Sequence, residues 1–194
     1  DPNREWGTNP CSEIILAGPK LDKNGNPISG TGGQFCNLSE VVIRASDNKK
    51  DLLRKVRLAT ILGTIQSTFT KFPYLRKVWA RNTAEERLLG VSLTGIMDNT
   101  LTNGKEGDLN ALLEELKQCA IDTNKEWADR LGIEVSAAIT CVKPSGTVSQ
   151  LTNSSSGIHA RHSPYYIRTV RGDNKDPLTQ FMKDQGVPNE PEAF

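Results

Sequence analysis

The sequence has no apolar run that approaches the ~18 residues a membrane-spanning helix needs. Its first residues, Asp-Pro-Asn-Arg, also lack the apolar core of a secretory signal peptide. These two absences predict a cytoplasmic chain that has no membrane partner.

An excess of charge of either sign is also missing, because 24 basic residues stand against 23 acidic ones. A surface that coats a polyanion is therefore not expected, and nucleic acid is not a predicted partner. Any phosphate group is expected to be bound by a few residues at one site and not by a broad basic surface. Hydrophobic residues at 36% and aromatic residues at 6% are few for a compact domain. This composition suggests that the 194 residues are part of a larger fold.

The four cysteines form no Cys-x-x-Cys pair. In a reducing cytoplasm they are expected to be free thiols and not a disulfide framework. Cys119 falls near the apolar side of a predicted helix and Cys141 inside a β-type run, so both are interpreted as core residues. His159 and His162 have no nearby cysteine or paired carboxylates, which leaves too few ligands for a metal site.

The apolar pattern predicts strands that alternate with helices. Residues 1–12 are expected to be irregular and residues 20–34 to form a loop, because both are rich in glycine, proline or asparagine. Short apolar or β-branched runs predict strands over 13–17, 35–44, 87–93 and 135–142.

Helical spacing predicts one helix that starts at Asp51 and ends at Pro73, and another over 108–131 with Gly132 just past its end. The buried stripe of the first helix is expected to hold Leu52, Val56, Ala59, Leu62 and Ile65. Strands that alternate with helices favour an α/β architecture with parallel strands.

The segment 9–13, Asn-Pro-Cys-Ser-Glu, carries an amide, a thiol and a carboxyl at alternate positions. In an extended conformation Asn9, Cys11 and Glu13 would point the same way, because side chains alternate along a strand. Three reactive groups would then share one face. The alternative is an Asn-Pro turn with a surface glutamate and a buried cysteine, since free cysteine is commonly a core residue.

The segment 143–147, Lys-Pro-Ser-Gly-Thr, follows a predicted strand and precedes a helix start. That arrangement aims free backbone N–H groups and two hydroxyls at an anion, and Gly146 permits close approach of a phosphate. The spacing does not fit the phosphate loop of nucleoside triphosphatases. The alternative is a plain helix cap.

Three segments, in this order, resemble the catalytic subunit of ribonucleotide reductases. Asn-x-Cys-x-Glu followed by Ile-Ile-Leu resembles the finger loop at the centre of the reductase barrel. Phe-Cys-Asn-Leu-Ser-Glu at 35–40 resembles the segment that carries one redox cysteine, and Pro-Ser-Gly-Thr matches the substrate-phosphate loop. The sequences of residues 7–16, 157–161 and 165–168 are most similar to the adenosylcobalamin-dependent class of bacteria and their phages.

The resemblance implies that residues 1–194 are the C-terminal portion of a ten-stranded α/β barrel with a central finger loop. The N-terminal half of that barrel would be a partner outside this chain. It implies the reduction of ribonucleotides to 2′-deoxyribonucleotides, the precursors of DNA, by a thiyl-radical mechanism.

The resemblance also implies residue roles. Cys11 would hold the thiyl radical and abstract the ribose 3′ hydrogen, Glu13 would take the 3′-hydroxyl proton, and Asn9 would hydrogen-bond the ribose oxygens. Burial is expected to raise the pKa of Glu13 towards the working pH. Cys36 would be one member of the redox-active disulfide. The family's other redox cysteine lies upstream, and no cysteine precedes Cys11 here.

Further implied components concern the ligands. The radical would come from adenosylcobalamin or, alternatively, from a metal-containing partner subunit. Electrons would come from a thioredoxin-like or glutaredoxin-like dithiol. The substrate phosphates would be held by Pro144, Ser145, Gly146, Thr147 and Val148.

Two other functions stay open. The chain could be a non-catalytic nucleotide-binding fragment of a split or truncated reductase, and by itself it is expected to be inactive. Cys11 could instead be the nucleophile of a hydrolase or transferase. Such enzymes need a base, and the only histidines lie beyond residue 158.

Overall fold

The computed structural model describes residues 2–192 and divides into two units between residues 161 and 162. The second unit carries helix α5 (Pro177–Asp184), which was not predicted from the sequence. Asp176 caps this helix by accepting a hydrogen bond from the Leu178 N–H, and Pro177 occupies its first turn. No helix within the described residues is long and apolar enough to cross a membrane.

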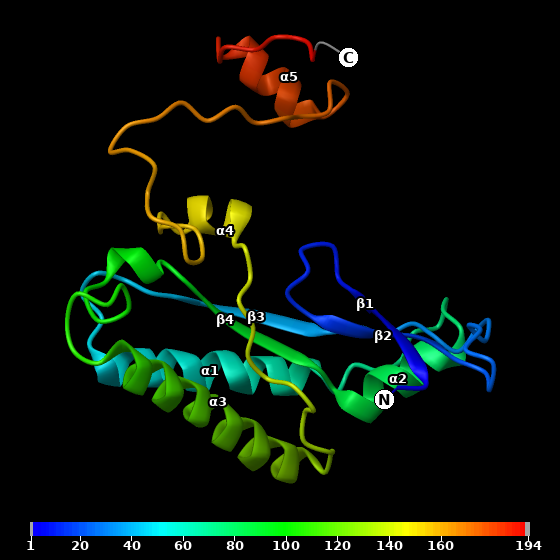
Figure 1. Ribbon diagram of the computed structural model, residues 1–194. Helices are drawn as coiled ribbons and strands as arrows, with labels where there is room; N and C mark the ends of the chain where they lie inside the picture. Colours follow the sequence, from blue (N-terminus) through cyan, green and yellow to red (C-terminus); the bar gives the residue numbers. More distant parts are fainter. Residues whose placement is uncertain (1, 193–194) are drawn as a thin grey trace. The chain divides into compact units, whose positions relative to one another are not determined.

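A parallel pair of strands lies at the centre of the first unit (Figure 1). Strand β3 (Asn37–Val42) pairs with β4 (Leu89–Thr94) in register from one end to the other. Both strands were predicted, and their parallel pairing confirms an α/β fold. The described residues contain two two-stranded sheets and show no closed barrel.

A third extended segment runs along β4 where a strand over 135–142 was predicted. The Val91 N–H donates to the Ile139 carbonyl, and the Cys141 N–H donates back to the Val91 carbonyl. Only one bridge, between Val91 and Thr140, is regular, so the prediction of a full strand was wrong. Val135 and Val142 are exposed, so no packing holds the two ends of the predicted strand.

Helices α1 (Lys49–Gln66) and α3 (Leu109–Leu131) cover one face of the β3–β4 pair and pack against each other (Figure 1). The sheet and the two helices bury one apolar cluster, which consists of Val41, Ile43, Leu52, Val56, Val91, Leu112, Leu116 and Ala120. Gly90 of β4 lies close to Ile14 of the N-terminal segment.

The apolar stripe predicted for α1 was only half right. Leu62 is 61% exposed and Ile65 is 37% exposed, whereas Thr60 and Thr64 are fully buried. Both threonine hydroxyls donate to the carbonyl four residues earlier. Thr64 also accepts a hydrogen bond of 3.0 Å from the Asn124 side chain of α3, so a polar contact takes the place of the expected apolar one.

Capping residues determine where the helices begin and end. Asn48 and Asp51 form a reciprocal capping box at the start of α1, and the helix stops at Gln66, well before the predicted end at Pro73. Helix α3 matches its prediction and ends on Gly132, whose φ of 65° only glycine adopts readily. Helix α2 (Lys77–Glu86) was missed, because only Val78, Asn82 and Thr83 of it are buried.

The finger is an antiparallel hairpin of β1 (Arg4–Thr8) and β2 (Ile15–Lys20). The prediction of an irregular segment over 1–12 was wrong for residues 4–8, which form β1, and right for residues 9–12; residue 1 lies outside the described residues. The strand expected to stop before Gly18-Pro19 continues through it. Arg4 pairs with Lys20 and Trp6 with Ala17, so the register shifts around Glu5. A β-bulge of this kind accommodates glycine and proline within a strand.

Candidate active site

The tip of the finger is a turn and not the extended segment predicted for residues 9–13. The Asn9 carbonyl accepts from the Ser12 N–H at 2.9 Å, and the Asn9 Oδ1 atom accepts from the Ile14 N–H at 3.1 Å. Ser12 has a φ of 60°, a conformation that non-glycine residues rarely adopt. The asparagine thus closes the loop on itself, and Cys11 is exposed at the tip.

Glu13 turns inward from this tip. Its side chain is 0% exposed, and its Oε1 atom accepts a hydrogen bond of 2.8 Å from Lys143 Nζ, whose side chain is 26% exposed. The Glu13 Oε2 atom is buried and has no hydrogen-bond partner among residues 2–192. One carboxylate oxygen is thus held by a cation, and the other is free to accept a proton.

The ionisation of Glu13 differs from the prediction. Burial raises its pKa, but the hydrogen bond from Lys143, together with smaller effects of its own backbone and of Asn9, lowers the pKa more. The net result is a pKa below the ordinary value of 4.5, so the predicted rise was wrong for this structure. The pKa of Lys143 is raised, chiefly because of its hydrogen bond to Glu13.

The charge of Glu13 shifts the pKa values of two nearby thiols. Burial and the Glu13 carboxylate raise the pKa of the half-buried Cys36. Burial and the same carboxylate raise the pKa of Cys141 to about 11, with a smaller contribution from Cys36. Both thiols are therefore protonated at neutral pH. Cys141 was interpreted as a core residue, but it shares the surroundings of Glu13.

A close contact at Gly90 seats the finger on the sheet. A Cβ atom on Gly90 would lie 2.4 Å from Leu38 Cδ2, 3.0 Å from Cys141 Sγ and 3.1 Å from Ile14 Cδ1. Ile14, which follows Glu13 in the finger, is buried at this contact. The missing side chain of Gly90 therefore lets the finger, β3 and the segment around Cys141 approach, which brings Glu13 to the end of the segment that carries Cys141 and Lys143.

The predicted phosphate segment leads into helix α4 (Gly146–Leu151). Its Ser145 hydroxyl is buried 2.5 Å from the Thr94 hydroxyl, and it accepts from the Gly157 N–H at 3.2 Å. Ser145 therefore holds the loop together and does not offer its hydroxyl to an anion. The other predicted residues are exposed to solvent: Pro144, Gly146, Thr147 and Val148.

No protein-family model matches the chain, but individual reductases do. The adenosylcobalamin-dependent ribonucleoside-triphosphate reductase of Lactobacillus gasseri is 32% identical over 213 aligned positions, which cover 97% of this chain. The enzyme of the same name from Lacticaseibacillus paracasei is 30% identical over 221 aligned positions and covers 100% of the chain. This chain is related to the adenosylcobalamin-dependent ribonucleotide reductases.

The fold agrees with that relationship. The crystal structure of a B12-dependent class II ribonucleotide reductase superposes with a TM-score of 0.61 and 24% identity, and the match covers 81% of this chain and 23% of that structure. The chain spans about a quarter of the length of the reductases it matches, 26% of the Lactobacillus gasseri enzyme and 27% of the Lacticaseibacillus paracasei enzyme.

Sequence reasoning missed Lys143 and Cys141 as members of the reductase-like site. Lys143 was visible as the residue before Pro-Ser-Gly-Thr, but nothing in the sequence indicates that it reaches Glu13. Glu40 on β3 was also missed. It is half-buried, its Oε1 atom has no hydrogen-bond partner, and burial raises its pKa.

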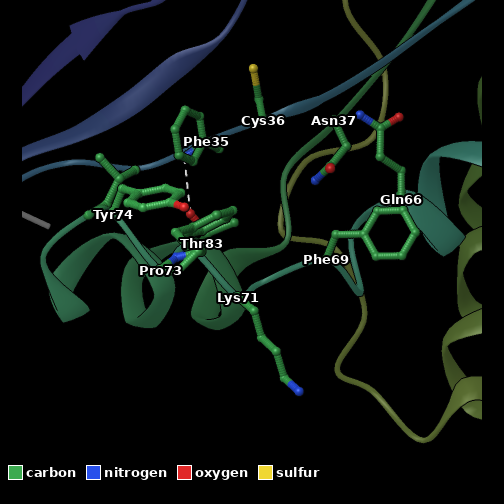
Figure 2. A pocket seen from close by; sticks show the side chains of 11 residues that line it. Phe35, Cys36, Asn37, Gln66, Phe69, Lys71, Pro73, Tyr74 and Thr83 are labelled. Carbon is green, nitrogen blue, oxygen red and sulfur yellow. Dashed lines mark hydrogen bonds between the residues drawn. The ribbon is translucent and has the colours of Figure 1, made fainter.

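A separate apolar pocket lies beside the start of β3 (Figure 2). Its lining includes Phe35, Phe69 and Tyr74, and the Phe35 N–H donates to the Thr83 hydroxyl at 3.0 Å. Cys36 borders the pocket, but Figure 2 shows its sulfur pointing away from Phe69. We assign no chemistry to this pocket.

Proposed function

We propose that this chain supplies the catalytic finger of a reductase that converts ribonucleotides to 2′-deoxyribonucleotides, the precursors of DNA. The proposal places the chain in the C-terminal portion of a ten-stranded α/β barrel, whose remaining strands come from the N-terminal part of the enzyme. One observation carries it: an exposed thiol at a hairpin tip stands two residues from a buried carboxylate with one unbonded oxygen. A radical reaction on a bound ribose needs those two groups together.

The finger residues then take the following roles. The Cys11 thiyl radical abstracts the ribose 3′ hydrogen, and the free Oε2 atom of Glu13 accepts the 3′-hydroxyl proton. The Asn9 side-chain amide hydrogen-bonds the ribose oxygens. The low pKa of Glu13 supports this assignment, because a base must be ionised before the substrate proton reaches it.

Adenosylcobalamin is the cofactor we propose, as the names of the relatives state for those enzymes. When bound, it supplies the radical that the reaction needs. The residues present fit such a group, because Cys11 is exposed at the tip of the finger and can be reached from outside the chain. A metal-containing partner subunit that generates the radical is the alternative source.

Cys36 supplies reducing electrons in this proposal. Removal of the 2′-hydroxyl as water requires two electrons and two protons, and two thiols provide both as they form a disulfide. The raised pKa of Cys36 keeps its proton available. Its partner would be a cysteine outside this chain, and a thioredoxin-like or glutaredoxin-like dithiol would reduce the disulfide again.

The substrate phosphates are proposed to lie against residues 144–148. Support comes from the exposure of Pro144, Gly146, Thr147 and Val148 and from Gly146, where an added Cβ atom meets nothing within 4 Å. The loop needs no glycine there for its own packing, so the open space is available to a ligand. A ribonucleoside triphosphate is the proposed substrate, because the relatives are named for it.

The test is a turnover assay of the complete reductase that contains this segment. Purified enzyme is incubated with adenosylcobalamin, a dithiol and each ribonucleoside diphosphate or triphosphate, and deoxynucleotide is measured by chromatography. Turnover of triphosphates with adenosylcobalamin is expected. Turnover only with an iron or manganese partner would overturn the cofactor, and nucleotide binding without any turnover would favour the non-catalytic alternative.

A further inference from the structure

We propose that Lys143 is a positioning residue for the reaction: it holds the Glu13 carboxylate in one orientation and keeps it ionised. This inference rests on the proposed function, since it concerns the base of that reaction. Lys143 was assigned no role by its sequence context, and it reaches Glu13 from a segment 130 residues further along the chain.

The orientation of the Glu13 side chain follows from the different surroundings of its two carboxylate oxygens. Lys143 Nζ occupies Oε1 at 2.8 Å, while Oε2 is buried and unbonded. A carboxylate that is free to rotate would present either oxygen. A fixed ammonium at one of them leaves the other as the only site for a proton, which fixes the direction from which the substrate hydroxyl must approach.

The burial of the pair explains why a cation is needed. Glu40, Cys36 and Cys141 interact electrostatically with Lys143, and the raised pKa values of the two thiols leave Lys143 as the charged partner of Glu13 at this point. The Glu13 side chain is inaccessible to solvent in these surroundings. Burial by itself would favour the protonated, neutral carboxyl, and that form cannot act as a base.

The position of Lys143 in the chain connects the proposed base, Glu13, with the proposed phosphate segment. It directly precedes Pro144, the first residue of the proposed phosphate segment. The same short stretch therefore contacts the Glu13 carboxylate and, three residues later, ends at the open Gly146. When a nucleotide binds to residues 144–148, the Glu13 carboxylate would already be oriented by Lys143.

The experiment compares the pH dependence of deoxynucleotide formation in single-turnover reactions of the complete reductase. The variants are Lys143→Met, Lys143→Arg and the matched control Lys117→Met, which removes a lysine from an exposed Lys–Glu pair on helix α3. In Lys143→Met the acidic limb of the rate profile is expected to move up by about one pH unit or more, so that the rate below that limb falls about tenfold.

Arginine keeps the charge, so Lys143→Arg is expected to restore the limb close to its wild-type position, and Lys117→Met is expected to leave it unchanged. A uniform loss of rate at every pH in Lys143→Met, with the limb unmoved, would overturn the claim that Lys143 keeps Glu13 ionised. An unaltered profile would overturn it as well.

A second readout separates this inference from the proposed function. Thermal unfolding of wild type, Lys143→Met, Glu13→Gln and the double variant forms a cycle that measures the coupling between the two side chains without any turnover. Additive shifts in Tm would reject the ion pair. Non-additive shifts in an enzyme that reduces no ribonucleotide would support the pair while the proposed function fails.

Discussion

Lys143 Nζ lies 2.8 Å from Glu13 Oε1, and this contact joins the tip of the finger to a segment 130 residues away in the sequence. The sequence places the two residues in separate motifs. The contact joins the two motifs, and it contributes to a pKa of Glu13 that is lowered and not raised as expected, because Lys143, the Glu13 backbone and Asn9 together outweigh the effect of burial.

The ion pair makes stability depend on pH in a defined direction. The pKa of Glu13 is lowered on folding, so its contribution is complete above pH 4.5 and is lost as the pH falls through the folded pKa. The pKa of Lys143 is raised, so its contribution is complete below pH 10.5 and is lost as the pH rises beyond it. Urea unfolding of wild type and Glu13→Gln should therefore differ most between these two values. A difference that grows towards acid pH would contradict the ion pair.

The contact at Gly90 predicts a strong effect on stability for a small substitution. Gly90→Ala would place a methyl group 2.4 Å from Leu38 Cδ2 and should lower the free energy of unfolding by about 1–3 kcal/mol, the usual cost of overpacking. Gly146→Ala is the matched control, because its added methyl group meets nothing within 4 Å. Equal stability of the two variants in urea unfolding would show that the finger is not seated on Gly90.

Replacement of Cys36 tests the redox proposal. The Cys36→Ser variant of the complete reductase should lose multiple turnover with a dithiol, because a serine cannot close the disulfide that delivers two electrons. Cys119→Ser serves as control, since the Cys119 thiol donates to the Leu53 carbonyl on α1 and takes no part in the finger. Deoxynucleotide formed per enzyme is the measurement. Sustained turnover in Cys36→Ser would reject the assignment.

Gly146 gives a clean test of the phosphate segment. Gly146 does not have a positive φ, so valine there strains the backbone no more than at other helix starts. Its side chain would instead fill the space proposed for the substrate phosphates. We expect Gly146→Val to fold normally by circular dichroism and to bind the ribonucleotide at least tenfold more weakly by calorimetry. Wild-type affinity in a folded variant would place the phosphates elsewhere.

Much of the fold could be predicted because it depends on local patterns. The strands β3 and β4 and the helix over 109–131 follow from apolar spacing, capping residues and Gly132. The errors have local causes too. The hydroxyls of Thr60 and Thr64 donate hydrogen bonds to backbone carbonyls within the same helix. These polar residues can therefore be buried where an apolar stripe was expected.

The site could be predicted only as separate motifs. Asn9, Cys11 and Glu13 were selected for an extended conformation, but residues 9–12 form a turn that Asn9 closes with its own backbone and side chain. The partner of Glu13 could not be found, because a contact across 130 residues leaves no periodic signal in a single sequence. The hydroxyl of Ser145 was expected to face an anion, but it is committed to Thr94.

The most direct test of the account is the rate of ribonucleotide reduction by the complete enzyme with serine in place of Cys11. The assay contains adenosylcobalamin, dithiol and ribonucleoside triphosphate, and the variant is compared with wild type and with Cys119→Ser. We predict that Cys11→Ser abolishes deoxynucleotide formation while it still binds the nucleotide, and that Cys119→Ser retains wild-type turnover. Deoxynucleotide formation by Cys11→Ser at the wild-type rate would contradict the account.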